Sequence, residues 1–391
     1  MLNFFFLYAA VWGAVFLLYS LGWSSLCTPL APGIQSFFIV TILCSLLLGT
    51  VFRKAFRFRA LPVCPRRSGG LTLLIVTLCF AEFAYCGQIP LLSILTGRAD
   101  YLSYTGIPTF HPLLITCGVF YEQYLFYLFL CFPRKKGLLL EYLALVTAVQ
   151  LLQYNRGGIV ICATMSGLML LSKLQSRIRL WHVLAVGVFG LGLLYGFGVF
   201  GNLRCGFAWN DCRYIAYIGQ FDRYPEWLPR QFMWGYIYIV SPMANLNHNV
   251  LLGTARSDLL GYLSTFLPDF ISRRLFPQTV GVQAAIIREE LNATAGFDRA
   301  YLFGGVVGMY GMYAYLAVGL LLAIWAVRRS PLYRVPTLAI CASIAVFLFF
   351  AHTISYSAIS FPIVYPLLLS LFRIRSLHKD PALMPEVRCS T

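Results

Sequence analysis

Long apolar runs, separated by short polar connections, constrain the fold of this chain more than any other feature of its sequence. A helix needs about 20 apolar residues to cross the roughly 30 Å hydrocarbon core of a bilayer, so each run predicts one membrane span. Composition agrees, because 59% of the 391 residues are hydrophobic and only 11% are charged. We therefore predict an all-α polytopic membrane protein with about ten transmembrane helices. The predicted spans cover residues 2–21, 34–52, 70–90, 109–132, 137–154, 157–172, 181–201, 301–326, 335–355 and 357–372.

Basic residues set the predicted orientation of these spans. The connections 53–67, 133–136, 173–179 and 327–334, together with the tail after Phe372, hold 19 of the 30 Lys and Arg residues. Because Lys and Arg are enriched in cytoplasmic connections, we place these segments and both termini in the cytoplasm. The net charge of +16 then follows from topology, and we predict no nucleic-acid partner. The first run lacks a basic n-region and a cleavage site, so we expect a retained helix and not a removed signal peptide.

One connection on the opposite, outward side is far longer than the others and divides the chain. The predicted parts are a bundle of about seven helices at 1–201, a large loop at 202–300, about three helices at 301–372 and a cytoplasmic tail at 373–391. Cys205 and Cys212 lie in the loop. Because the outward side of a bacterial membrane is oxidising, these two thiols could form a disulfide.

The large loop contains nine arginines and eight carboxylates but no lysine. Arginine suits planar, bidentate contact with phosphate or carboxylate, which lysine cannot make. The alternative is that these arginines pair with the neighbouring acids. Residues 257–277 space their apolar side chains as on one helix face, with a break at Pro268 and with Arg273 and Arg274 near the end. This pattern predicts two amphipathic helices at the membrane surface, with both guanidiniums at the level of the lipid headgroups.

Motifs for nucleotide and metal chemistry are absent from the sequence. It contains no G-x-x-x-x-G-K-[ST] phosphate loop, no D-x-D pair, no H-E-x-x-H motif and no G-x-S-x-G nucleophile. We therefore expect no metal and no cofactor, and an ATP-driven pump is disfavoured. Any chemistry must use a substrate that is already activated.

Three glutamates interrupt apolar runs, where an ionised carboxylate is unfavourable. Glu82 lies nearest the outward end of its run, and the other two are Glu122 and Glu141. Each carboxylate serves either chemistry or structural pairing between helices. Histidines near the outward side present a similar choice between a general base and an interfacial hydrogen-bonding residue. These histidines are His111, His248 and His352.

Arg156 stands between two apolar runs, at the predicted outward turn of a helical hairpin. Gly157 and Gly158 follow it and allow another backbone or a ligand to approach closely. Gly167 lies eleven positions after Arg156. Because the hairpin and the large loop face the same compartment, Arg156 and the loop arginines could together clamp a pyrophosphate.

Four segments carry a resemblance to a known family. They are the Arg156 to Gly167 spacing, ADYLSYTGIPTFHPL (99–113), FLPDFISRRLFP (266–277) and FDRAYLFGGVVGMYG (297–311). In this order and topology they resemble the Wzy-type O-antigen and oligosaccharide repeat-unit polymerases. In that family the first corresponds to a motif in which ten residues separate an arginine from a glycine. The other three correspond, in order, to the first outward loop, the end of the large loop and a glycine-rich entry to the next helix. Leu267 stands eleven positions after Arg256, so only Arg156 carries the arginine–glycine spacing.

The resemblance implies a glycosyltransferase of the bacterial inner membrane that acts at the periplasmic face. Its donor would be a glycan on undecaprenyl pyrophosphate and its acceptor a single lipid-linked repeat unit. Membrane lipids and a chain-length regulator protein are the further expected partners. Our hypothesis assigns four arginines to the pyrophosphate, namely Arg156, Arg256, Arg273 and Arg274. It assigns the acceptor proton to one of three candidate bases, which in falling order are Asp258, His248 and Glu82.

Two alternatives remain open from the sequence. An O-antigen ligase shares the architecture and the lipid-linked donor but delivers the glycan to lipid A core, and His248 would be its loop histidine. A secondary transporter or flippase for lipid-linked glycans would place charges near the bilayer midplane and often shows internal symmetry. Charge is instead concentrated in one outward loop and no two-fold repeat is visible, so the sequence favours an enzyme.

Overall fold

A computed structural model describes residues 2–65, 69–96, 104, 106–175 and 179–379. Parts of four predicted segments, namely 53–67, 99–113, 173–179 and 373–391, lie outside the described residues. Every regular element in the described residues is a helix, which confirms the predicted all-α class. The α-helices are α1 (Phe4–Ser20), α2 (Pro32–Val51), α3 (Gly70–Cys86), α4 (Pro90–Leu95), α5 (Phe110–Cys131), α6 (Lys136–Leu145), α7 (Arg156–Leu174), α8 (Leu180–Arg204), α9 (Arg213–Gly219), α10 (Phe232–Leu252), α11 (Leu259–Ser264), α12 (Asp269–Leu275), α13 (Asp298–Ala326), α14 (Pro331–Phe347), α15 (Ser357–Ser360) and α16 (Val364–Lys379). Short 3₁₀ helices lie at Arg53–Phe56, Pro277–Thr279, Glu289–Leu291 and Phe361–Ile363, and a π-helix lies at Val146–Leu151.

Five helices in the described part of the chain are long and apolar enough to cross a membrane, namely α2, α5, α7, α8 and α13. Shorter apolar helices add α1, α3, α14 and the segment Ser357–Leu371. This content is typical of a multi-pass membrane protein. The predicted span 137–154 takes a different form, because α6 runs into the π-helix and the chain then turns at Tyr154, which has a φ of 55°.

The core lies around α1 and α14. α14 packs against α1, α5, α7 and α13, and it is buried without interruption from Arg334 to Ala345. α1 packs against α2, where the ring centroids of Trp12 and Phe38 lie 4.4 Å apart. α8 differs, because its apolar residues are almost all exposed and its main packing partner is α10. An apolar helix with so little protein cover is expected to face lipid.

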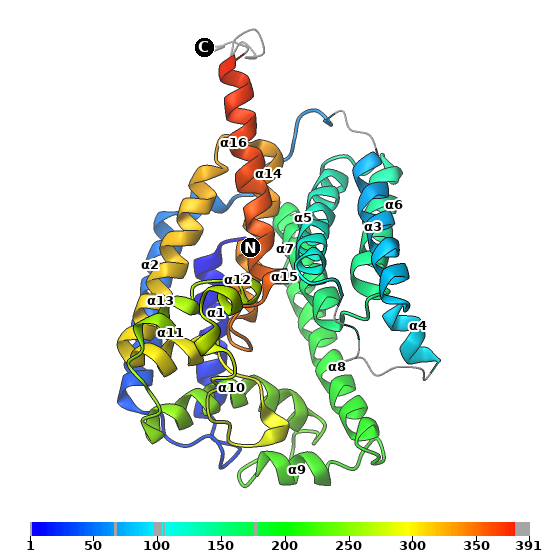
Figure 1. The fold of residues 1–391 in the computed structure, drawn as a ribbon. Helices are drawn as coiled ribbons and strands as arrows, with labels where there is room; N and C mark the ends of the chain where they lie inside the picture. Colours follow the sequence, from blue (N-terminus) through cyan, green and yellow to red (C-terminus); the bar gives the residue numbers. More distant parts are fainter. Residues whose placement is uncertain (1, 66–68, 97–103, 105, 176–178, 380–391) are drawn as a thin grey trace.

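α10 is a buried helix inside the predicted loop 202–300. It lies with α9 at the lower end of Figure 1, whereas α16 ends at the top. Pro242 and several asparagines interrupt its apolar pattern, which is why the sequence did not predict it. Two of these asparagines hold neighbouring backbone: Asn245 Nδ2 donates to the Leu291 carbonyl at 2.8 Å, and Asn249 Nδ2 donates to the Ala285 carbonyl at 2.7 Å. α10 therefore fixes a segment that leads into α13.

The predicted helix break at Pro268 is present between α11 and α12. Pro268 has a φ of −56° and a ψ of 144°, so its backbone is extended and α12 begins at the next residue. Proline favours this position because it has no N–H to donate to a preceding turn. Arg273 and Arg274 occupy the last turn of α12, as the sequence pattern indicated.

The two loop cysteines do not form the disulfide that the sequence allowed. Both thiols are free, and Cys212 is buried. Asn202 on α8 donates to Cys212 Sγ at 3.3 Å, and its side-chain oxygen accepts from the Trp234 indole at 2.7 Å. Hydrogen bonds, and not a covalent link, therefore join the end of α8 to α10.

Candidate functional site

α12 lies between a polar pocket and an apolar groove. Asp269 and Arg273 line the pocket, whereas Pro268 and Ile271 line the groove. Helical residues three or four apart share a face, so the order of residues in the sequence produces this division. The helix is anchored at its start, where the Asp269 N–H donates to the Ser355 carbonyl at 3.0 Å.

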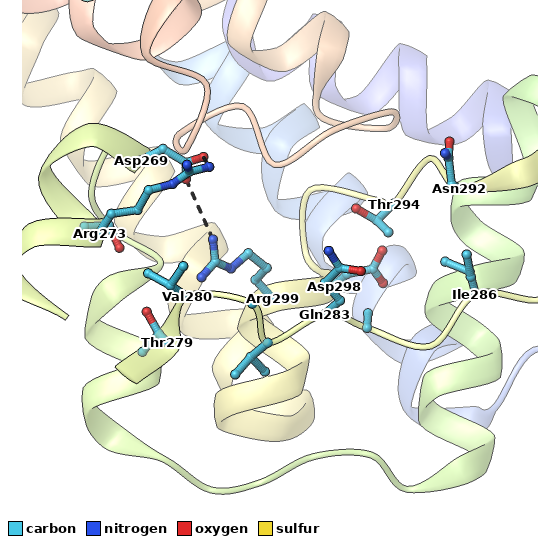
Figure 2. Close-up of a pocket in the computed structure, with 14 residues that line it drawn as sticks. Asp269, Arg273, Thr279, Val280, Gln283, Ile286, Asn292, Thr294, Asp298 and Arg299 are labelled. Atoms are coloured by element: carbon cyan, nitrogen blue, oxygen red, sulfur yellow. Dashed lines mark hydrogen bonds and ion pairs between the residues drawn. The ribbon is translucent and has the colours of Figure 1, made fainter. Parts of the chain in front are cut away.

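The polar pocket has a volume of about 500 Å³. Its walls come from α12, from the segment that follows α12 and from the start of α13 (Figure 2). Arg273, Arg299 and Asp269 lie together at one end of the pocket in Figure 2, and side chains with amide and hydroxyl groups lie toward the other end. Asn292 and Thr294 lie at that second end, and Gln283 lies beside Asp298 between the two ends.

Asp269 pairs with both arginines of the pocket. Arg273 Nη2 donates to Asp269 Oδ2 at 3.2 Å, and Arg299 Nη1 lies 3.8 Å from Asp269 Oδ1. The side chains of Arg273 and Arg299 are 67% and 27% exposed. Exposed ion pairs contribute only about 0–1 kcal/mol to stability. The Arg273 guanidinium can therefore exchange Asp269 for an anionic ligand with a small change in free energy, and the 3.8 Å separation leaves Arg299 only loosely paired.

Asp298 is the buried carboxylate of the pocket. It begins α13 and is 1% exposed, and neither of its carboxylate oxygens has a hydrogen-bond partner in the described part of the chain. The buried Nε of the adjacent Arg299 also has no partner among the described residues. Buried polar groups are nearly always hydrogen-bonded in native proteins. These two groups are therefore candidates to bind a hydroxyl or phosphate of a ligand.

His352 lies in the connection between α14 and α15, close to the Arg299 charge. Its Nδ1 is 2.6 Å from Ser355 Oγ, and its ring is 7% exposed. Burial, reinforced by the nearby Arg299, lowers the pKa of His352 to about 3. The imidazole is therefore uncharged at neutral pH and adds no positive charge to the pocket.

Comparison with protein families, with curated proteins and with solved structures finds no match. Two residues of the pocket, Asp298 and Arg299, were not among the sequence candidates, although they stand in the segment 297–311. Their signal in the sequence is an adjacent acid and arginine at the start of an apolar run, which is too common a pattern to identify a site.

The predicted pyrophosphate arginines do not all meet at one place. Among the described residues that line the pocket, Arg273 is the one member of that set. Arg274 follows it on α12, and its guanidinium donates to Thr109 Oγ1, just before α5. Arg256 is exposed, and its backbone N–H donates to the Leu302 carbonyl at 2.8 Å.

Arg156 is the first residue of α7, at a tightly built turn. Asn155 caps the helix, because its Oδ1 accepts from the Gly158 N–H at 2.9 Å. A Cβ added at Gly158 would collide with the Gln150 and Asn155 side chains, so a larger residue would displace both from this turn. Gly167 meets no such restriction. Arg156 is an exposed residue, and its guanidinium lies over the Tyr154 ring, 4.9 Å from the ring centroid.

The candidate bases Asp258 and His248 lie outside the pocket lining. Asp258 precedes α11, and its N–H donates to the Phe303 carbonyl at 3.0 Å. His248 is half-buried on α10. Neither side chain forms an ion pair with another described residue.

The three glutamates of the apolar runs are all paired. Glu141 accepts from the Thr72 hydroxyl, and Glu122 accepts from Gln150 Nε2 at 3.4 Å. These contacts join helices, as the structural alternative predicts. Glu82 lies near the end of α3, where it contacts the His111 ring of α5.

Proposed function

We propose that this protein is an O-antigen polymerase, a glycosyltransferase that joins undecaprenyl-pyrophosphate-linked repeat units at the periplasmic face of the bacterial inner membrane. In this proposal both termini are cytoplasmic. The observation that supports it most is the position of α12 between a polar pocket with two arginines and an apolar groove. A lipid-linked glycan has matching parts, because it joins sugars and a pyrophosphate to a long hydrocarbon chain.

The polar pocket suits the head of such a donor. Arg273 and Arg299 would bind the pyrophosphate, since the guanidinium fork matches the spacing of phosphate oxygens. Asn292, Thr294 and Asp298 offer donors and acceptors for sugar hydroxyls toward the other end. The pocket volume of about 500 Å³ lies in the usual range for small-ligand sites, roughly 300–1,000 Å³.

The apolar groove suits the polyprenyl chain of the donor. It has a volume of about 290 Å³, and its lining is almost entirely apolar. Tyr315 and Ala323 lie about two turns apart on α13 and both line it, so the groove follows this helix. Burial of a hydrocarbon chain there is favourable by about 25 cal/mol per Å² of apolar surface. The charged pocket on the other side of α12 fixes which end of the lipid enters the groove.

Charge stabilisation is the chemistry that this arrangement offers. When the donor glycan is transferred, negative charge develops on the departing pyrophosphate, and fixed guanidiniums stabilise that charge. A polymerase handles two lipid-pyrophosphate substrates. We assign Arg156, Arg256 and Arg274, which lie outside the pocket lining, to the second of them.

A reconstitution experiment tests the proposal. The full-length protein is placed in nanodiscs and mixed with lipid-linked repeat units. These units are extracted from the bacterium that encodes the protein after deletion of its gene, so that they are not yet polymerised. We expect a ladder of longer glycans on a gel, without any ion gradient. Absence of a ladder would overturn the polymerase proposal; transfer only to added lipid A core would identify a ligase, and lipid movement without a new product a flippase.

Two variants separate the head and tail parts of the site. The double change Arg273→Ala with Arg299→Ala should weaken binding of undecaprenyl pyrophosphate by at least about tenfold. Arg213→Ala is the matched control, because Arg213 is an exposed arginine of the same region that pairs with Asp211 and does not line the pocket. Gly319 on α13 also lines the groove, and a Cβ added to it meets nothing within 4 Å, so Gly319→Leu should weaken the same binding by filling the groove.

A further inference from the structure

Glu82 and His111 form a carboxylate–imidazole pair where the end of α3 meets the start of α5. His111 Nδ1 lies 3.1 Å from Glu82 Oε1 and 3.0 Å from Oε2. The Glu82 side chain is 0% exposed, whereas the His111 side chain is 24% exposed. The Ile107 N–H donates to Glu82 Oε1 at 3.0 Å. With Nδ1 held by the carboxylate, Nε2 has no partner among the described residues and is available to accept a proton.

The backbone before α5 is shaped around the His111 ring. Gly106 has a φ of 64°, and a Cβ added to it would lie 2.5 Å from His111 Cγ. The Tyr104 ring meets His111 edge-on, with 5.7 Å between centroids. Thr109 has a φ of 71° and a ψ of −46°, which is unusual for a β-branched residue. Such strain costs about 1–3 kcal/mol and persists mainly at functional sites.

α12 connects this pair to the polar pocket. Arg273 lines the pocket, and the next residue, Arg274, donates to Thr109, two positions before His111. Glu82 and His111 do not line the pocket, but α12 contacts both the pocket and the segment that precedes His111. His352, a second histidine, differs from His111 in burial: it is 7% exposed, its Nδ1 is bonded to Ser355, and its unpartnered Nε2 is enclosed by protein in the described part of the chain.

We propose that His111 is the general base of the transferase and that Glu82 is its positioning residue. This inference rests on the proposed function and assigns a role within it. The acceptor hydroxyl attacks the anomeric carbon of the donor, and its proton passes to His111 Nε2. A glycosidic C–O bond forms while the C–O bond to pyrophosphate breaks, and the lipid pyrophosphate leaves with the electron pair. Glu82 stabilises the imidazolium until His111 returns its proton to water.

His111→Asn separates chemistry from structure. The Asn amide can still donate to Glu82 from near the position of Nδ1, but it has no basic nitrogen. In the nanodisc assay we expect turnover to fall by about 10²–10⁴-fold, while binding of undecaprenyl pyrophosphate and the thermal midpoint stay unchanged. In His111→Ala, added imidazole should restore part of the lost turnover. The control His182→Asn, whose ring stacks on Trp181 at 3.7 Å, should elongate at the wild-type rate.

Glu82→Gln tests the positioning role, because the amide still accepts from Nδ1 but carries no charge. We expect kcat to fall by about 10²-fold with KM unchanged, and we expect almost no further loss when the change is made in His111→Asn. An equal loss of kcat when Glu82→Gln is made in the wild-type protein and in His111→Asn would show a purely structural role for Glu82.

If His111→Asn elongates glycans at the wild-type rate while the double variant of Arg273 and Arg299 loses donor binding, this inference fails and the proposed function stands. A wild-type protein that makes no ladder would overturn both.

Discussion

Two fully buried glutamates are satisfied in different ways. Glu82 is paired with the partly exposed ring of His111, whereas Glu122 is held by Cys162 at 3.1 Å and by Gln150 at 3.4 Å, both of which are themselves buried. The two pairs differ in access: the His111 side chain is 24% exposed, whereas both partners of Glu122 are enclosed by protein. Burial of a carboxylate in an apolar run therefore does not identify a functional group. The exposure of its partner separates the two cases.

The surroundings of Glu122 explain its enclosed pairing. Gln150 belongs to the π-helix, and its Oε1 accepts from Asn155 Nδ2 at 3.3 Å. Asn155 in turn caps α7 at the residue before Arg156. A chain of buried and part-buried hydrogen bonds therefore runs from Glu122 to the Arg156 turn, and it stabilises the hairpin. In the described residues, the Glu82 pair is joined instead by the Ile107 N–H, close to the strained backbone at Thr109.

The largest effect that would sharpen this comparison is expected for Gly106→Ala. The alanine would have to adopt a φ of 64°, and its Cβ would press on the His111 ring. The imidazole should therefore move away from Glu82. We expect turnover to fall by about 10²-fold, as for loss of general-base catalysis. The control is Gly87→Ala at the end of α3, because Gly87 has a φ of 68° but nothing within 4 Å of its added Cβ. Equal turnover in the two variants would show that the His111 ring position is irrelevant.

His352 extends the comparison to a histidine with no carboxylate partner. Its pKa is lowered to about 3, whereas an unfolded histidine titrates near 6.5, so between these values the unfolded chain binds a proton that the native chain does not. The unfolding free energy should be level above pH 6.5 and fall below it, by up to about 1.4 kcal/mol per pH unit. Arg299 is the charged group nearby, and Asp269 contacts the same connection through Ser355. His352→Asn should flatten this slope in thermal unfolding measured from pH 7 to pH 4; an unchanged slope would assign it to other groups.

The sequence predicts the features of this fold that depend on neighbouring residues. The apolar runs, the break at Pro268 and the turn at Arg156 all follow from local patterns. α10 was missed because its asparagines resemble a polar loop until their backbone partners are known. The count of spans stays a prediction, since the described residues contain five helices of sufficient length.

The candidate site could be predicted only in part, because its contacts join distant segments. Arg273 was identified from its place at the end of an amphipathic helix. Its neighbours in the pocket, Asp298 and Arg299, come from another helix, and no periodicity relates them to α12. The Glu82 and His111 pair spans 29 positions, and the Arg274 contact with Thr109 spans 165. Local patterns carry no information on such pairings.

Replacing each glutamate with glutamine gives the most direct contrast, and the smallest effect on turnover is expected at Glu122. Glu122→Gln keeps an acceptor for Cys162 and Gln150, so the unfolding free energy should change by no more than about 1 kcal/mol. Turnover in the nanodisc assay should remain within about twofold of wild type, because no group near Glu122 exchanges a proton with substrate. Glu82→Gln, measured beside it, should lose activity without losing stability. If Glu122→Gln abolishes turnover while the protein stays folded, access does not distinguish the two glutamates, and the enclosed network takes part in catalysis.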